Sequence, residues 1–120
     1  MNEHFHSHAN DIDAVERDRI TAFCAAEVAR GEDWVKLAER VLGELAFYSM
    51  QVKSKTGQWS MGELDRFVTE SLPSHLGDPT VTRAAPEVIT VFARWLKASG
   101  QVPSCDVPAI EKRMRKVSGR

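Results

Sequence analysis

Histidine and cysteine are the residues of this chain best suited to hold a metal ion or to act as nucleophiles. His4, His6 and His8 alternate close to the N-terminus, and imidazole is a good ligand for zinc, nickel and copper. A metal site is normally built on ordered elements whose hydrogen bonds orient the ligands. Residues 1–10 are polar and follow no helical or strand period, so we expect a flexible arm whose histidines serve no metal site.

Nucleophilic catalysis would need a cysteine held next to a base. Cys24 lies in an apolar stretch typical of a small buried residue, and Cys105 lies in a loop that contains proline. His75 lies in a turn-rich segment, and none of these residues stands at the spacing of a zinc motif. Glycine-rich phosphate loops and the G-x-S-x-G motif are absent from the sequence. The sequence therefore predicts neither an enzyme nor a cofactor.

The C-terminal residues offer another chemistry, because cations there could neutralise phosphate groups. The last ten residues carry five cations against one acid, whereas residues 1–30 carry six acids against three arginines. The same cations would also suit the C-terminal end of a solvated helix. Nucleic-acid binding through residues 112–120 is therefore an alternative hypothesis. Its candidate contacts are Lys112, Arg113, Arg115 and Lys116.

Length and composition are those of one globular domain, which we place at residues 11–120. The 120 residues are 42% hydrophobic and 28% charged, and a formal net charge of −1 gives no general attraction to polyanions. Two cysteines do not make a disulfide scaffold. No stretch approaches the ~18 apolar residues of a membrane span, and no secretory signal is visible. We expect a cytoplasmic protein that does not engage a membrane.

Helical periodicity runs through this domain, and no segment alternates as a strand does. The sequence predicts an all-α bundle of about five helices. The first is capped by Asp11 or Asp13 and ends near Arg30–Gly31, and the second runs from Asp33 to about Lys55. A capping box opens the third at Ser60 and Pro73 stops it, while the others run from about Thr82 to Ser99, with Pro86 in the first turn, and from Asp106.

The second predicted helix has an apolar stripe broader than one neighbouring helix needs. Apolar surface left uncovered would mark a face that binds a partner. A non-catalytic protein-interaction or assembly module, as a homodimer or with an unknown protein partner, is therefore the first hypothesis. The residues expected on that interaction surface are Trp34, Val41, Leu45 and Tyr48.

Trp59 stands directly before the Ser60–Glu63 capping box, where an apolar residue often packs back onto the first turn of the helix. A tryptophan in this position is more typical of core packing than of a ligand site. We expect its ring to close the corner between the third and fourth helices, near Phe67, Phe92 or Trp95.

Residues 58–102 also follow a recognisable layout of helix starts, a Leu-Pro pair and aromatic positions. Its elements are Trp59-Ser60, Phe67, Leu72-Pro73, Ala85-Pro86-Glu87, Phe92, Trp95-Leu96 and Gly100. This layout resembles a helical segment of bacterial proteins that carry the SEC-C metal-binding motif. Ser74-His75 stands where those proteins usually have a basic residue, and the cysteine-rich SEC-C tail is absent. The resemblance implies a helical accessory module without zinc.

Overall fold

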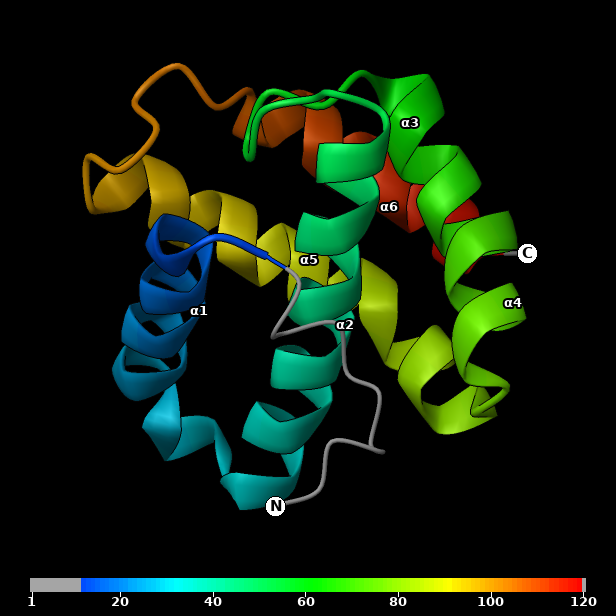
Figure 1. Ribbon diagram of the computed structural model, residues 1–120, viewed down its shortest axis with the longest axis horizontal. Coiled ribbons are helices and arrows are strands. Elements are labelled where there is room, and N and C mark those ends of the chain that lie inside the picture. The colour runs from blue at the N-terminus through cyan, green and yellow to red at the C-terminus, as the bar shows by residue number, and fades with distance from the viewer. Residues whose placement is uncertain (1–11, 120) are drawn as a thin grey trace.

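The computed structural model describes residues 12–119, and the regular elements in that range are all helical (Figure 1). Because α3, η4 and α4 follow one another without a break, they make one helical rod. With α1, α2, α5 and α6, the described residues form five such rods. This confirms the predicted all-α bundle, whereas residues 1–10, the predicted arm, lie outside the described range. The elements are α1 (Ala14–Ala26), η3 (Val28–Arg30), α2 (Glu32–Gln51), α3 (Met61–Arg66), η4 (Phe67–Ser71), α4 (Leu72–Leu76), α5 (Pro79–Ala98) and α6 (Val107–Ser118).

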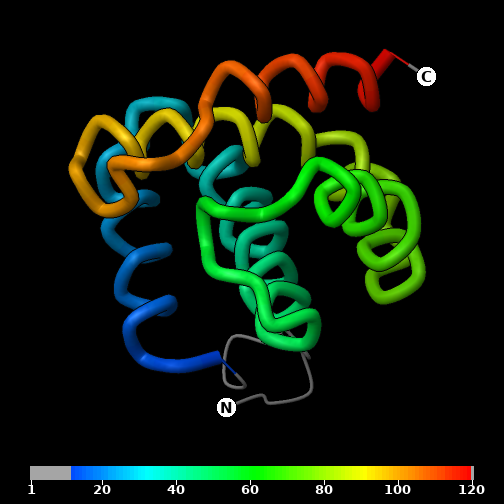
Figure 2. Tube along the Cα trace, turned by 90° about the horizontal axis from the view of Figure 1, so that it is seen from above, coloured from blue at the N-terminus to red at the C-terminus, as the bar shows by residue number. Residues whose placement is uncertain are grey.

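Helices α2 and α5 form the centre of the bundle. In Figure 1, α1 lies on one side of α2 and the rod of α3, η4 and α4 lies on the other. Figure 2 shows α6 running back along α5, which it packs against. Four aromatic residues gather where α1, α2 and α5 meet: Phe23, Trp34, Phe92 and Trp95. None of the helices within residues 12–119 has the length and apolar character that crossing a bilayer requires.

Local side-chain chemistry fixes where the helices begin. The predicted capping box is confirmed: Ser60 Oγ accepts from the Glu63 N–H at 3.1 Å, and Glu63 Oε1 accepts from the Ser60 N–H at 2.9 Å. Carboxylates cap three further N-termini by accepting from a backbone N–H in the first turn. These caps are Asp13 for α1, Asp78 for α5 and Asp106 for α6.

Pro73 does not stop the third helix, and that prediction was wrong. The chain passes through the π-helical turn η4, in which the Leu72 N–H bonds to the carbonyl of Phe67, and it continues as α4 to Leu76. In a regular α-helix, the Pro73 ring would clash with the carbonyl of Thr69. The helix would also lose one hydrogen bond, because proline has no backbone N–H. The wider π turn directly before α4 puts the proline at the start of that helix, where its missing N–H costs little.

Two other predicted boundaries were also wrong. Helix α5 begins at Pro79, not near Thr82, so Pro86 lies inside the helix instead of in its first turn. Asp78 supplies the cap and Pro79 the first helical position, a combination that fits proline because its φ is already helical. Helix α2 ends at Gln51, before Lys53 adopts a positive φ of 59°.

Trp59 is buried, with 4% of its surface exposed, as the packing interpretation required. It lines a narrow space together with Phe92 of α5, one of the three predicted neighbours. The other residues that line it come from α1, α2 and the connection before α3, and none comes from α3 itself. The indole N–H donates to Ser49 Oγ of α2 at 2.8 Å. The tryptophan therefore secures the chain to α2.

Candidate functional sites

The interaction surface predicted on α2 is not available in the folded domain. Val41, Leu45 and Tyr48 are buried, with 0%, 1% and 8% of their surfaces exposed. Trp34 is half-buried, and the guanidinium of Arg30 lies 4.9 Å from the centre of its ring. The broad apolar stripe is covered within the domain, because α1, α5 and η4 all pack around α2. The stripe therefore gives no support to a homodimer through this helix.

The predicted basic contacts of α6 do not act as one set. Arg113 forms an ion pair with Asp65 of α3, with 2.5 Å between Nη1 and Oδ2, and is therefore directed into the bundle. Lys112, Arg115 and Lys116 are exposed. Of these three, Arg115 lies beside α5, where the packing of α6 brings it to other arginines.

The arginine groove, as we call it, lies between α5 and α6 and has a volume of about 440 Å³. Its four arginines come from three elements: Arg30 of η3, Arg83 and Arg94 of α5, and Arg115 of α6. The other lining residues are Pro86, Glu87, Thr90, Val91, Glu111, Met114 and Ser118. On α5, the spacing of Arg83, Glu87, Thr90 and Arg94 places them on one helix face, which the sequence alone could have suggested. Their meeting with Arg30 and Arg115 follows only from the tertiary packing.

The two carboxylates of the arginine groove are already engaged. Glu111 Oε2 lies 2.5 Å from Nε of Arg94, and Glu87 Oε1 accepts from the Trp34 indole N–H at 3.4 Å. By contrast, Arg83 and Arg115 are exposed and have no side-chain partner among the described residues. The groove therefore presents two uncompensated guanidinium groups, each able to make a bidentate contact with a carboxylate or phosphate.

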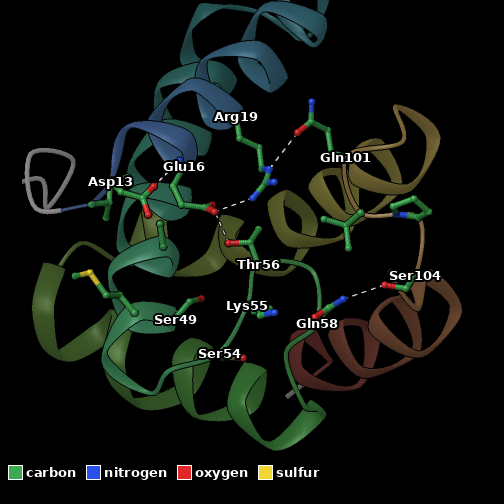
Figure 3. A pocket seen from close by; sticks show the side chains of 15 residues that line it. Asp13, Glu16, Arg19, Ser49, Ser54, Lys55, Thr56, Gln58, Gln101 and Ser104 are labelled. Carbon is green, nitrogen blue, oxygen red and sulfur yellow. Dashed lines mark hydrogen bonds and ion pairs between the residues drawn. The ribbon is translucent and has the colours of Figure 1, made fainter.

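A second concavity, the polar cleft, has a volume of about 460 Å³ and opens beside the start of α1 (Figure 3). Its walls are the first turns of α1, the end of α2, and the connections at 54–58 and 101–104. Ten of the lining residues are polar: Asp13, Glu16, Arg19, Ser49, Ser54, Lys55, Thr56, Gln58, Gln101 and Ser104. The apolar ones are Ile12, Ala46, Met50, Val102 and Pro103.

Hydrogen bonds between distant segments hold this cleft open. Thr56 Oγ1 donates to Glu16 at 2.8 Å, and Arg19 Nε donates to Gln101 Oε1 at 3.3 Å, as the dashed lines in Figure 3 show. Across the other wall, Gln58 Nε2 donates to Ser104 Oγ at 3.0 Å. The sequence does not reveal this site, because its polar residues follow no common spacing and meet only through the fold.

Neither cysteine has the surroundings of a nucleophile. Both thiols are buried and form no disulfide; Cys105, although it lies in the loop before α6, is only 1% exposed. Burial, together with the nearby charge of Glu39, raises the pKa of Cys24 to about 11. Burial likewise raises the pKa of Cys105. At neutral pH both are therefore protonated thiols, which react slowly.

His75 has an acidic neighbour that the sequence did not indicate. Its Nδ1 lies 3.4 Å from Oε1 of Glu44, a carboxylate that is buried on α2. A pair of this kind falls short of a metal site, and residues 12–119 contain no group of three or more histidine, cysteine or acidic residues placed to hold an ion. His4, His6 and His8 lie outside the described residues.

No family model matches the chain, and neither a curated protein nor a solved structure matches it. The resemblance of residues 58–102 to SEC-C-associated proteins therefore stays a prediction.

Proposed function

We propose that this domain is a non-catalytic binding module that holds an acidic segment of a partner protein in the arginine groove. The observation that carries the proposal is the gathering of four arginines from η3, α5 and α6 along one groove. Two of them, Arg83 and Arg115, have charges that no described side chain compensates. Carboxylates of a bound segment would supply the missing partners through bidentate contacts.

A protein segment suits this groove better than a nucleic-acid backbone. Glu87 and Glu111 lie among the arginines and would repel a continuous run of phosphates, whereas a peptide can place neutral groups beside them. The floor includes the apolar residues Pro86, Val91 and Met114, against which an apolar side chain could rest. Arg113, one of the predicted phosphate contacts, is occupied by Asp65. The partner segment we propose therefore alternates acidic and apolar residues.

The role of an accessory module, which the SEC-C resemblance implies, belongs to the same proposal. We also propose a cytoplasmic location. The two unpaired, buried thiols of Cys24 and Cys105 support it, since free thiols persist in reducing compartments.

Fluorescence anisotropy with defined probes tests this function. The probes are a labelled peptide that alternates glutamate and leucine, the matching lysine–leucine peptide, and a labelled DNA duplex. We expect saturable binding of the acidic peptide alone, with an affinity that falls as salt is added. Arg83→Gln and Arg115→Gln should each weaken binding by about tenfold, the equivalent of one lost charged contact of about 1.4 kcal/mol.

The matched control is Arg66→Gln, because Arg66 is an exposed arginine of α3 outside the groove. It should leave the affinity unchanged. Since Arg83 and Arg115 are exposed, the test variants should fold like the parent, which circular dichroism can verify. Tighter binding of the duplex than of the acidic peptide would favour the nucleic-acid alternative. An equal loss of affinity in Arg83→Gln, Arg115→Gln and Arg66→Gln would show that the arginine groove is not the binding site.

A further inference from the structure

We propose that the polar cleft is a second binding site, which takes a small zwitterion of the class of free amino acids and short peptides. This inference does not depend on the partner segment proposed above. The cleft is formed by α1, α2 and two connections, whereas the arginine groove is formed by η3, α5 and α6. Its volume of about 460 Å³ falls within the ~300–1,000 Å³ typical of small-molecule sites.

The charges around the cleft point to a ligand that carries both signs. Glu16 and Arg19 compensate each other, with 2.7 Å between Oε2 and Nη1. What remains is one anion, Asp13, and one cation, Lys55, which comes from a different segment (Figure 3). Lys55 has no ion-pair partner in the part of the chain that the structure describes. A ligand with an ammonium and a carboxylate group could satisfy both, whereas a ligand with one charge would meet a like charge.

The neutral lining fits the rest of such a molecule. Met50 is 50% exposed at the cleft, and Val102 and Pro103 lie on another wall, so an apolar side chain has surfaces to contact. Gln58 and Gln101 add amide groups, which complement a peptide bond. No aromatic side chain is among the lining residues, all of them described, so a nucleobase would find no ring to stack on.

The site is also largely preformed. Thr56 is tied to Glu16 and Gln58 to Ser104, so the two connections are already held against α1 and against each other. Gly57 permits a close approach of these walls, because a Cβ built there would lie 3.0 Å from Cγ1 of Val102. A ligand would therefore lose little free energy in ordering the cleft.

Titration of the full chain, labelled with ¹⁵N, tests the inference by NMR. The zwitterionic probes are free methionine and the dipeptide glycyl-leucine. The comparison probes are N-acetylmethionine amide, which has lost both charges, together with glucose and adenosine. We expect saturable shifts of the amide signals of residues 54–58 and 101–104 with the zwitterions alone, at millimolar concentrations or below.

Two substitutions remove the charges without removing structure. Lys55→Gln removes the cation, and Asp13→Ser removes the anion but keeps a residue that can cap α1. Each should weaken binding of the zwitterions by about tenfold. Lys53→Gln is the matched control, since this lysine lies two residues away and does not line the cleft, and it should have no effect.

Several results would overturn the inference. They are the absence of saturable shifts with either zwitterion, binding of the neutral amide, glucose or adenosine as tight as that of methionine, and unchanged affinity in Lys55→Gln and Asp13→Ser. Shifts confined to α5 and α6 would also contradict it, because they would place the zwitterion in the arginine groove.

Discussion

Trp59 donates its indole N–H to Ser49 over 2.8 Å, and Ser49 donates in turn to the carbonyl of Leu45 over 2.7 Å. Both side chains are buried, with 4% and 3% of their surfaces exposed. The chain of hydrogen bonds fastens the connection before α3 to the last turns of α2. Trp59 is thus an apolar core residue and a polar anchor at once.

Truncating this tryptophan should destabilise the domain strongly. Trp59→Ala is expected to lower the free energy of unfolding by about 3–5 kcal/mol, because it leaves a cavity and removes the hydrogen bond that Ser49 accepts. Trp59→Phe keeps most of the apolar ring and should cost about 1–3 kcal/mol. Ser60→Ala, which removes only a cap, should cost about 1 kcal/mol. Urea unfolding followed by circular dichroism measures the stability of all three variants. A Trp59→Ala variant that is as stable as the parent but no longer binds a partner would instead make Trp59 a recognition residue.

The capping box should contribute stability that depends on pH. The backbone N–H of Ser60 is the main cause that lowers the pKa of Glu63, with smaller help from Ser54 and Arg66. Since the folded pKa lies below the unfolded value, the stabilisation is present above the unfolded pKa of about 4.5 and is lost as the pH falls through the folded one.

Glu63→Gln is the matched variant for this effect, because glutamine can still complete the box but does not titrate. Urea unfolding between about pH 3 and pH 7 should show the parent more stable at the upper end and the two proteins converging at the lower end. A difference that does not change over this range would contradict the assigned cause.

The thiol of Cys24 should give the opposite pH dependence, with stability lost as the pH rises. Burial raises its pKa from 9.0 to about 11, so the folded state holds the proton more tightly than the unfolded state. The contribution of this thiol to the free energy of unfolding is fully present below pH 9. It should fall by about 2 kcal/mol as the pH rises towards 11. The comparison is with Cys24→Ala, which shares every other titration. Rapid reaction of the native protein with a thiol reagent at neutral pH would show that the thiol is not protected.

Gly57→Ala should lower the free energy of unfolding by more than the positive φ of this position alone explains. Gly57 and Gly100 have similar positive φ values, 83° and 78°, but only at Gly57 would an added Cβ meet another group, Val102 at 3.0 Å. Gly100→Ala is expected to cost about 1–2 kcal/mol and Gly57→Ala about 1–3 kcal/mol more. Adding Val102→Ala to Gly57→Ala should recover part of that excess, as a double-mutant cycle would measure. Equal costs at the two glycines would rule out the crowding.

The helices could be read from the sequence because their signals are local. Apolar spacing of three and four residues and the caps at Asp13, Ser60 and Asp106 act within one or two turns, and the structure follows them. Pro73 was misread because the sequence does not reveal a π turn, which accommodates the ring by a change of hydrogen-bond register. Local rules could not decide between stopping a helix and widening it.

The candidate sites were hidden for a different reason. Periodicity identified the apolar face of α2 but not how many neighbours would cover it, so Val41 and Leu45 were assigned to a surface although they lie in the core. Arg115 was recognised as one cation of a terminal run, yet its neighbours in the groove include Arg30 and Arg83, far away along the chain. Such meetings depend on helix packing, which residue spacing does not determine.

The bond between Arg19 and Gln101 joins positions 82 residues apart. The entropy lost in closing a loop grows with the logarithm of its length, so this contact forms at least cost once the intervening helices have brought its ends together. The polar cleft consequently exists only after α1 and the 101–104 connection have both docked. A molecule bound there would stabilise the complete domain by mass action and leave partly folded chains unaffected, which makes the cleft a reporter of finished folding.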